Sequence, residues 1–339
     1  MKLLLTGGTG FLGQTVARRL AAAGHELRLL VRENSVLTGL PEDAELVRGD
    51  VTEHSSLRSA AFGCEAVLHM AALVKMWVPD RARFDAVNVG GLLNALAAAK
   101  EAGARLIYTS SFIAVGPTGP EPADESHRHP GGYRNDYERT KAAADGLAQQ
   151  AVDGGQDVVR LYPGVVYGPG ELTDGNLVVR MLVDHLGGRM PGIVGKGDRL
   201  WSYAFVEDVA EGHLQALERG LSGERYFLAG ENATMDGLFA QIAELTGVPP
   251  PRRHIPYAVA RALGFAMWGW AELTGHEPKL THQVVDVFRE HWAYSSKKAE
   301  VELGYKCRPL REGLRITLDW LSKQGLLKAT PQSHRGTEG

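Results

Sequence analysis

The chain opens with Met1-Lys-Leu-Leu-Leu-Thr-Gly-Gly-Thr-Gly-Phe-Leu-Gly13, an apolar run that passes into a glycine-rich turn. Leu3 to Leu5 have the composition of a strand buried on both faces of a parallel sheet. Gly7, Gly10 and Gly13 stand where a Rossmann unit needs residues without a Cβ, for the tight turn, for the approach to a pyrophosphate and for close packing of the next helix. The N-terminus of that helix then presents free N–H groups and a positive dipole end to phosphates. The stretch therefore predicts a dinucleotide-binding unit.

Strand and helix patterns alternate beyond this turn. Residues 14–23 carry helical apolar spacing, Gly24 stands where a helix would stop, and residues 27–31 form a second apolar strand pattern. Such alternation predicts an α/β fold, a doubly wound parallel Rossmann sheet with helices on both faces, and it places a ligand at the carboxyl ends of the strands. Further strand patterns cover residues 45–49, 66–69, 105–109 and 157–161, with helical segments such as 85–102 and 136–150 between them.

The rhythm changes after Pro169, where longer helical patterns replace the strands. We expect residues 1–168 to form the dinucleotide-binding Rossmann domain, to which some later segments return. Residues 169–328 are expected to form a smaller, mainly helical substrate-binding lobe. Residues 329–339 lack apolar periodicity and are expected to form a disordered tail.

Bulk properties indicate a globular, enzyme-sized chain of 339 residues with a formal net charge of −3. This charge gives no field that would recruit nucleic acid. The two cysteines, Cys64 and Cys307, lie far apart without metal-ligand spacing. We therefore expect no disulfide framework, no metal site and a cytoplasmic location. No stretch of about 20 uncharged apolar residues is available to span a bilayer.

The closest approach to a membrane signal is residues 257–275, rich in Ala, Leu, Phe, Met and Trp but interrupted by Arg261 and Glu272. Two interpretations stay open. One is an amphipathic helix packed on the smaller lobe. The other is a lid or interfacial helix that makes peripheral membrane contact and admits a lipophilic substrate.

Tyr137 and Lys141 form an i, i+4 pair in a segment that favours helix, so both lie on one face. A tyrosine hydroxyl titrates near pH 10, and an adjacent ammonium favours the phenolate and lowers that pKa. The pair is therefore suited to exchange a proton with a carbinol or carbonyl oxygen while hydride moves to or from a nicotinamide. The preceding strand ends in Tyr108-Thr-Ser-Ser111, which brings hydroxyls to the edge where substrate is expected.

With these motifs the chain resembles the extended short-chain dehydrogenase/reductases, the NAD-dependent epimerase/dehydratase family, over nearly its whole length to about Lys323. The motifs stand in the family's order. They are Thr6-Gly-Gly-Thr-Gly-Phe-Leu-Gly13, Gly49-Asp-Val51, His69-Met-Ala-Ala72, Asn88-Val-Gly90, Tyr108-Thr-Ser-Ser111, Tyr137-Glu-Arg-Thr-Lys141, Tyr162-Pro-Gly-Val-Val-Tyr-Gly-Pro169, Val206-Glu-Asp-Val-Ala210 and Glu302-Leu-Gly-Tyr305.

The resemblance implies a role for each catalytic candidate. Tyr137 would be the general acid/base, Lys141 would lower its pKa and hold the nicotinamide ribose, and Ser111 would hydrogen-bond the reacting oxygen. Asn88 stays open between cofactor-proximal structure and a proton relay. The cofactor-binding residues implied are Gly7, Thr9, Gly10, Phe11, Leu12, Gly13, Arg32, Asp50, Val51, Ala71, Ala72, Asn88, Tyr137, Lys141, Pro163, Gly164 and Val165.

Three other polar residues, His69, Arg160 and Asp208, are better interpreted as structural, and we assign them no chemical role.

Arg32 stands just past the second strand, where a guanidinium pairs with the 2′-phosphate of NADP and a carboxylate would bind the ribose of NAD. NADP(H) is therefore favoured as the cofactor. NAD(H) remains the alternative, because the adjacent Glu33 can approach the ribose hydroxyls.

Within the superfamily the chain is most similar to dihydroflavonol reductase-like proteins and, more narrowly, to plant farnesol dehydrogenase. This likeness implies oxidation or reduction of an alcohol/carbonyl pair on a lipophilic molecule, such as an isoprenoid alcohol, a flavonoid or a steroid-like compound. Each apolar pocket candidate can equally be ordinary core. These candidates are Val74, Met76, Trp77, Phe112, Met181 and Trp201.

Two other functions and an assembly stay open. A nucleotide-sugar epimerase or dehydratase shares the fold and the Ser-Tyr-Lys set, although Trp201 stands where such enzymes usually carry an arginine. Arg199 and Arg180 are the candidates to replace that arginine. A non-enzymatic alternative is a redox-sensing cofactor-binding module, which would be free to lose Tyr137 or Lys141. Residues 85–102 and 136–150 can also form a four-helix homodimer interface, as is common in this superfamily.

Overall fold

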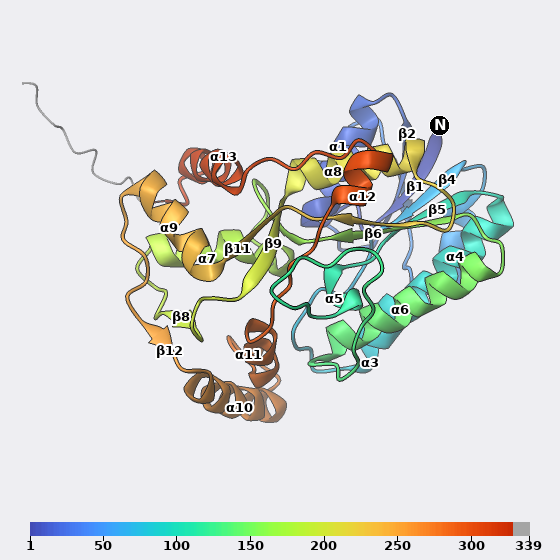
Figure 1. Cartoon of the computed structure of the whole chain (residues 1–339). Coiled ribbons are helices and arrows are strands. Elements are labelled where there is room, and N and C mark those ends of the chain that lie inside the picture. Colours follow the sequence, from blue (N-terminus) through green and yellow to red (C-terminus); the bar gives the residue numbers. More distant parts are fainter. Residues whose placement is uncertain (328–339) are drawn as a thin grey trace, which may run out of the picture.

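The structure, a computed structural model, describes residues 1–327, so the tail predicted at 329–339 lies outside the described residues. The chain forms a large α/β lobe and a smaller lobe beside it (Figure 1). The carboxyl edge of the large sheet faces the junction between the two lobes.

Seven parallel strands form the large sheet in the order β10-β6-β5-β4-β1-β2-β3. This confirms the predicted doubly wound Rossmann architecture, and the order reverses direction at β1, between β2 and β4. Leu3, Leu4 and Leu5 of β1 are fully buried, as expected for a central parallel strand. The strands are β1 Lys2–Thr6, β2 Glu26–Val31, β3 Glu45–Arg48, β4 Ala66–His69, β5 Arg105–Thr109, β6 Val158–Pro163 and β10 Arg225–Leu228.

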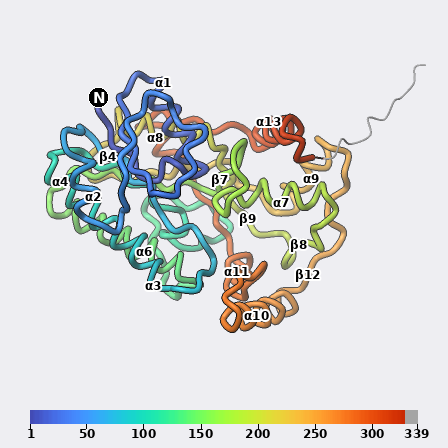
Figure 2. Tube along the Cα trace, turned by 180° about the vertical axis from the view of Figure 1, so that it is seen from behind, coloured from blue at the N-terminus to red at the C-terminus, as the bar shows by residue number. Residues whose placement is uncertain are grey.

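Helices cover both faces of this sheet, as the two views show (Figures 1 and 2). Leu3 and Leu5 point into the core beneath one helix layer, and Leu4 points into the core beneath the other, because side chains alternate along a strand. The first layer contains α1 Phe11–Ala22, α8 Val206–Arg219 and α12 Lys297–Glu302; the second contains α2 His54–Ala61, α4 Gly91–Ala102 and α6 Asp136–Asp153.

The helix predicted at residues 85–102 is divided. Ala82–Phe84 (α3) leads into a π-helical turn, Asp85–Gly90 (η1), before α4 begins at Gly91. A π-helical turn takes one extra residue per turn and often occurs at functional sites. Apolar spacing does not reveal such a turn, because the flanking helical turns keep their usual period.

The smaller lobe is helical, as predicted, and also contains two small sheets that the sequence pattern missed. Its strand β9 is almost entirely buried, so it lacks the alternation that marks a half-exposed strand. The short helix α5, Phe112–Val115, follows β5 and contacts α6 of the large lobe. The elements of the smaller lobe are β7 Val165–Tyr167, η2 Asp174–Asn176, α7 Leu177–Leu186, β8 Ile193–Val194, β9 Leu200–Phe205, β11 Glu231–Thr234, α9 Met235–Thr246, β12 His254–Ile255, α10 Tyr257–Thr274, α11 His282–Phe288 and α13 Leu310–Lys323.

Helix α10 lies at the outer edge of the molecule, with α11 between it and the body (Figure 1). The two helices approach closely at Gly264, where a Cβ would lie 2.5 Å from the backbone nitrogen of His282. Within residues 1–327, no helix combines the length and the apolar character needed to cross a bilayer.

Candidate functional site

The predicted site residues follow the carboxyl ends of six neighbouring strands. The glycine turn follows β1, Arg32 follows β2, Asp50 follows β3, Ala71 follows β4, and Ser111 follows β5. Pro163 ends β6 and is followed by Gly164 and Val165. Since all these strands are parallel, their carboxyl ends meet at one edge, where open α/β sheets bind ligands.

The glycine turn is a steric requirement at two of its positions. Gly7 has a φ of 75°, and a Cβ there would lie 2.6 Å from the backbone nitrogen of Ala71. A Cβ on Gly13 would lie 2.0 Å from the Gly7 carbonyl oxygen. A Cβ on Gly10, the N-cap of α1, would have one neighbour within 4 Å, the Gly7 carbonyl oxygen at 3.4 Å. The turn is therefore a close backbone cradle whose helix N–H groups stay available to a phosphate.

Thr9, Phe11 and Leu12 complete this turn, and Phe11 connects it to the segment after β7. Its ring packs on the backbone of Gly170, where a Cβ would lie 2.7 Å from the ring.

Thr6, which the sequence reasoning missed, joins the first and fourth strands. Burial lowers the pKa of His69 to about 3, so this imidazole is neutral. The Thr6 hydroxyl lies 2.9 Å from His69 Nδ1 and accepts a hydrogen bond from the Ala71 amide at 3.3 Å. Because the neutral imidazole of His69 offers an acceptor nitrogen, the Thr6 hydroxyl can donate to it and accept from the Ala71 amide. These two bonds hold Ala71 and the adjacent Ala72 beside the glycine turn. His69 is structural here, as interpreted.

The exposed end of the site is basic. The Arg32 side chain is exposed and makes no hydrogen bond or ion pair within the described part of the chain. Arg48 Nη1 donates to the carbonyls of Arg32 and Glu33 at 2.8 and 3.1 Å. Two guanidinium groups therefore lie at the ends of β2 and β3, where an adenosine would reach.

Asp50 and Val51, on the next turn of chain, are held locally. The Asp50 carboxylate accepts from the Thr52 amide and hydroxyl at 2.9 and 2.8 Å, and the Val51 carbonyl accepts from Asn94 Nδ2 at 2.9 Å. These bonds fix the backbone after β3 and leave its outer edge facing the site.

Ser111, Tyr137 and Lys141 come together where β5 ends and α6 begins. Ser111 is the N-cap of α5, and its hydroxyl accepts from the Ile113 amide at 3.4 Å. Tyr137 and Lys141 lie on the first turns of α6 and are buried. Lys141 Nζ donates to the Thr109 carbonyl at 3.0 Å and contacts the Tyr108 hydroxyl at 3.3 Å.

Burial sets the protonation of this group. It raises the pKa of Tyr137 to about 12, against a smaller lowering by the Ser111 hydroxyl. It lowers the pKa of Lys141 to about 8, against a smaller raising by Asp145 on the same helix. The Tyr137 hydroxyl therefore carries its proton at neutral pH, and Lys141 changes charge just above neutrality.

Asn88, on the π-helical turn, connects two parts of the site. Its Oδ1 accepts from the Leu73 amide at 2.7 Å, and its Nδ2 donates to the Thr140 hydroxyl at 3.0 Å. Asn88 thus ties the loop after β4 to α6, one residue before Lys141.

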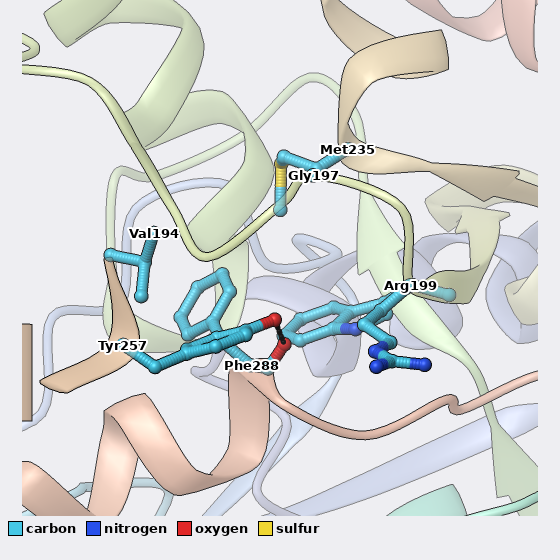
Figure 3. Close-up of a pocket in the computed structure, with 7 residues that line it drawn as sticks. Val194, Gly197, Arg199, Met235, Tyr257 and Phe288 are labelled. Atoms are coloured by element: carbon cyan, nitrogen blue, oxygen red, sulfur yellow. Dashed lines mark hydrogen bonds between the residues drawn. The ribbon is translucent and has the colours of Figure 1, made fainter. Parts of the chain in front are cut away.

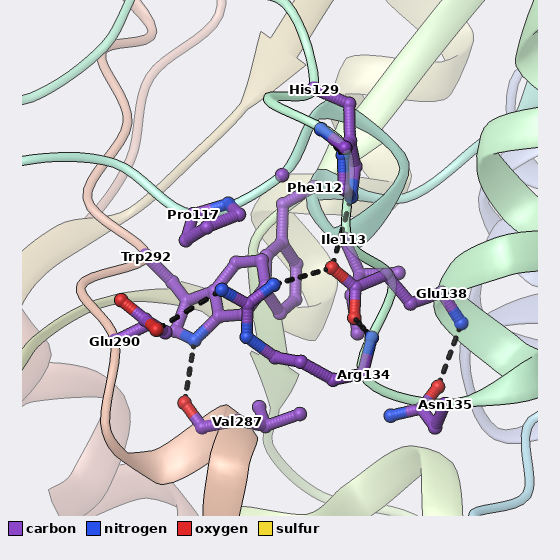
Figure 4. A network of polar contacts seen from close by, with 12 residues as sticks. Phe112, Ile113, Pro117, His129, Arg134, Asn135, Glu138, Val287, Glu290 and Trp292 are labelled. Carbon is purple, nitrogen blue, oxygen red and sulfur yellow. Dashed lines mark hydrogen bonds and ion pairs between the residues drawn. The ribbon is translucent and has the colours of Figure 1, made fainter. Parts of the chain in front are cut away.

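Glu138, the residue after Tyr137, is fully buried and anchors a network that the sequence reasoning missed (Figure 4). It accepts from His129 Nε2 at 2.9 Å and from the amide and Nη1 of Arg134 at 2.7 and 2.8 Å. Arg134 also pairs with Glu290 of the smaller lobe at 3.1 Å. The i, i+4 spacing of Arg134 and Glu138 could have predicted their ion pair. No short-range pattern predicts that His129 or Glu290 joins this network.

Five apolar candidates belong to, or pack against, the large buried cluster that contains Tyr137. Trp201 belongs to the same buried cluster as Tyr137, and Val74, Met76, Phe112 and Met181 pack against that cluster as partly buried side chains.

Trp77 is placed differently, because its indole donates to Glu272 of α10 at 2.9 Å.

Trp201 lines a cavity of about 10 Å³, room for about one water molecule (Figure 3). Tyr257 and Phe288 close this cavity, and the Phe288 ring lies 4.9 Å from that of Trp201. The space beside Trp201 is therefore filled by aromatic side chains of the smaller lobe.

Arg160 and Asp208 have structural partners, as interpreted. Asp208 lies in the first turn of α8 and pairs with Arg308 at 2.6 Å, and Arg160 donates to the Gly223 carbonyl at 3.2 Å. No cluster of three or more His, Cys, Asp or Glu in residues 1–327 has the arrangement of a metal site.

The family model of the NAD dependent epimerase/dehydratase family matches residues 3–229 of the chain. A Synechocystis protein, provisionally named a dihydroflavonol 4-reductase, is 32% identical, with 96% of this chain and 95% of that protein covered. Sterol demethylase protein B of Methylococcus capsulatus is 30% identical, with 96% and 100% covered. The 4-hydroxy-2-methyl-3-oxo-4-farnesyl-3,4-dihydroquinoline-1-oxide ketoreductase of Stigmatella aurantiaca is 31% identical, with 91% and 92% covered.

Two solved structures share the fold over nearly the whole chain. The crystal structure of gox2253 has a TM-score of 0.82 at 34% identity and covers 96% of this chain and 99% of its own. The Thermus thermophilus UDP-glucose 4-epimerase in complex with NAD has a TM-score of 0.75 at 25% identity, with 95% and 99% covered.

The glycine turn yields a first prediction. Gly13→Ala should lower the melting temperature and abolish dinucleotide binding, because its Cβ would lie 2.0 Å from a carbonyl oxygen. Gly10→Ala should keep the wild-type melting temperature, because its nearest contact is at 3.4 Å. It should nevertheless weaken dinucleotide binding about tenfold or more, since a methyl group would stand where the phosphates approach. Calorimetry of unfolding and of binding measures both effects.

The matched control is Gly146→Ala, which places its methyl group in open space on α6. If Gly10→Ala binds the dinucleotide with unchanged affinity, the phosphates do not bind at this turn.

Proposed function

The chain belongs to the NAD dependent epimerase/dehydratase family, as its motifs suggested, and from that premise we propose an NAD(P)-dependent oxidoreductase that interconverts an alcohol and a carbonyl. The proposed substrate is a small lipophilic molecule. The observation that carries this proposal is the convergence of Ser111, Tyr137 and Lys141 beside one apolar cluster at the carboxyl edge of the sheet.

The residues present fit a dinucleotide. The glycine cradle leaves room for phosphates at the start of α1, and Lys141 is held at the edge where a nicotinamide ribose would reach. A bound nicotinamide would supply or accept the hydride.

Tyr137 carries the proton in this proposal. Because burial raises its pKa to about 12, the hydroxyl is protonated at neutral pH and can donate to a carbonyl oxygen during reduction. The phenolate formed takes a new proton from solvent before the next cycle. In the oxidation direction, a Tyr137 phenolate takes the proton from the substrate hydroxyl. Ser111 hydrogen-bonds the same oxygen, and the charged Lys141 stabilises the phenolate.

A lipophilic substrate is supported by the apolar side chains that pack against the buried cluster containing Tyr137. Val74, Met76, Phe112 and Met181 offer apolar surface that is only partly buried within the chain itself. The names of three relatives refer to a dihydroflavonol, a sterol and a farnesylated quinoline, all with large apolar parts. The proposed pocket residues therefore share an apolar character that suits such a substrate.

A nucleotide-sugar epimerase is the second candidate, favoured by the likeness to the Thermus enzyme. Against it, both arginines that are candidates to replace the missing diphosphate ligand already have partners within the chain. Arg199 Nη1 lies 2.8 Å from His291 Nε2, and Arg180 pairs with Asp174. Trp201 itself is packed among aromatic side chains.

NADP(H) is the proposed cofactor, with NAD(H) as the alternative. The exposed guanidinium of Arg32, whose backbone carbonyl accepts a hydrogen bond from Arg48 Nη1 at 2.8 Å, supports recognition of a 2′-phosphate. Cys64 and Cys307 are both free thiols, which fits the proposed cytoplasmic location.

Tyr137→Phe should lower kcat by roughly 10²- to 10⁴-fold, because it removes the proton donor and leaves the ring in place. Reduction and oxidation are followed by nicotinamide absorbance with farnesol, geraniol, aromatic alcohols, hydroxysteroids and nucleotide sugars under both cofactors. Tyr133→Phe is the control, since Tyr133 is half exposed beside the same helix. Undiminished turnover in Tyr137→Phe would refute the enzymatic assignment, and turnover of nucleotide sugars alone would favour the epimerase.

The pH profile tests the role of Lys141. Its charge is present below a pKa of about 8 and is lost above it, so kcat/KM for carbonyl reduction should fall as the pH rises through about 8. Lys141→Arg keeps the charge to much higher pH, so any residual activity should lose this limb. If kcat/KM of Lys141→Arg still falls at the same pH, the group that titrates there is not Lys141.

Arg32→Ala should weaken NADP binding about tenfold or more and leave NAD binding unchanged, because a charged hydrogen bond is worth about 1.5–3 kcal/mol. Titration of both cofactors measures this difference, with the exposed Arg58→Ala on α2 as the control. Equal or tighter binding of NAD to the wild-type protein would overturn the NADP preference.

A further inference from the structure

Helix α10 presents a continuous apolar stripe to solvent. Val259, Leu263, Trp270 and Leu273 are 57, 54, 67 and 85% exposed, and Ala266 lies between them. Their spacing of three and four residues places all of them on one face of the helix over its whole length. Large apolar side chains gathered this way on a surface mark an interaction site.

The opposite side of α10 is occupied by the protein itself. Gly264 allows close contact with the start of α11, and Phe265 stacks on His282 with ring centroids 3.9 Å apart. Ala260 and Ala271 are buried on this side. The exposed stripe is therefore not needed to hold α10 in place.

The acidic residues beside the stripe form ion pairs within the protein, which leaves basic residues as the unpaired charges there. Glu272 pairs with Arg81 at 2.7 Å, and Glu277 pairs with Lys75 at 2.9 Å, so both carboxylates are held by the loop after β4. The acidic residues of α11 and of the segment after it are likewise paired, Asp286 with Arg261 and Glu290 with Arg134.

Three basic residues near the stripe stay exposed and make no ion pair within the described part of the chain. Two lie before the N-terminus of α10 and one lies after its C-terminus. They are Arg252, Arg253 and Lys279.

We propose that α10 docks the protein on the surface of an anionic phospholipid bilayer. The helix lies parallel to the surface, its apolar stripe enters the boundary between headgroups and acyl chains, and the flanking cations contact anionic headgroups. This is the behaviour of an interfacial amphipathic helix, and the position of α10 at the outer edge of the molecule permits it (Figure 1).

Charge favours a bilayer over a second copy of the chain. If two α10 helices paired across a two-fold axis in antiparallel fashion, Arg252 and Arg253 of one would face Lys279 of the other. A parallel pair would also bring like charges together. An anionic surface neutralises both ends of the helix at once.

The docked helix is connected to the candidate site. Glu272 receives the indole N–H of Trp77 at 2.9 Å, and Lys75 contacts Glu277, so α10 rests on the loop that carries Val74 and Met76. A lipophilic molecule dissolved in the bilayer would therefore meet the protein beside this loop. Docking itself is independent of the chemistry proposed for the site.

The test is co-sedimentation of the full chain with vesicles of phosphatidylcholine alone or mixed with phosphatidylglycerol. The wild-type protein should bind the anionic vesicles and bind them less in about 0.5 M salt. Trp270→Ser/Leu273→Ser should lower the partition coefficient roughly tenfold or more, because each side chain loses its apolar transfer energy. Arg252→Glu/Arg253→Glu should weaken binding to anionic vesicles only.

The matched control is Phe62→Ser/Val301→Ser, which removes two apolar side chains that are 81 and 79% exposed elsewhere on the surface. This control should bind like the wild type. Unfolding curves check that each variant is folded, and nicotinamide turnover is not needed as a readout.

Trp270→Phe keeps the stripe apolar and should still bind, while quenching of tryptophan fluorescence by brominated lipid should fall. No binding of the wild type to either vesicle, or equal binding by Trp270→Ser/Leu273→Ser, would overturn the proposal. A wild-type dimer that this double variant converts to a monomer would assign the stripe to a second copy instead.

Discussion

The close approach of three backbone segments at the end of β1 is the constraint on which the site depends. The turn at Gly7 touches the backbone after β4, and Gly13 touches the turn itself, at distances that exclude any Cβ. This contact brings α1 onto the sheet with its N-terminus at the carboxyl edge. Because β1 lies where the strand order reverses, the same edge gathers the loops after β2 and β3 on one side and after β4, β5 and β6 on the other.

Burial of polar groups around this edge is balanced by specific partners. Buried polar groups cost free energy unless they are hydrogen-bonded. Thr6 satisfies the neutral His69 and the Ala71 amide, and the Thr109 carbonyl receives Lys141. Each of these bonds also sets the position of a loop or a side chain at the site. Stability and geometry therefore rest on the same contacts.

The two lobes are also joined by a close contact between backbone segments. A Cβ on Gly164 would lie 2.6 Å from the Ser202 carbonyl oxygen, so the chain leaving β6 runs directly against β9. The pairing of Arg134 with Glu138 and Glu290 adds a charged connection beside Tyr137. The buried cluster that contains Tyr137 likewise draws residues from both lobes.

Local sequence predicted much of this arrangement. Six of the seven strands of the large sheet were recognised as short apolar runs followed by turn residues. Strand β10 was missed, because it returns to the sheet from the part of the chain assigned to the smaller lobe. The glycine turn and the Tyr137 and Lys141 pair were recognised because each is a fixed short spacing. Short-range patterns of this kind report what neighbouring residues must do. They located the fold and the edge of the sheet where the candidate site lies.

Contacts between residues far apart in the sequence were decided only by the tertiary structure. Nothing near Thr6 predicts His69, and nothing near Arg134 predicts Glu290. The π-helical turn at Asn88 and the buried strand β9 left no periodic signal. The local pattern of residues 257–275 left two interpretations open, because an apolar helical pattern does not state which face meets the protein. Local sequence therefore indicated six strands of the large sheet, the glycine turn and the chemical groups available. Packing set their partners, their protonation and which surfaces stay exposed, since burial is a property of the whole chain.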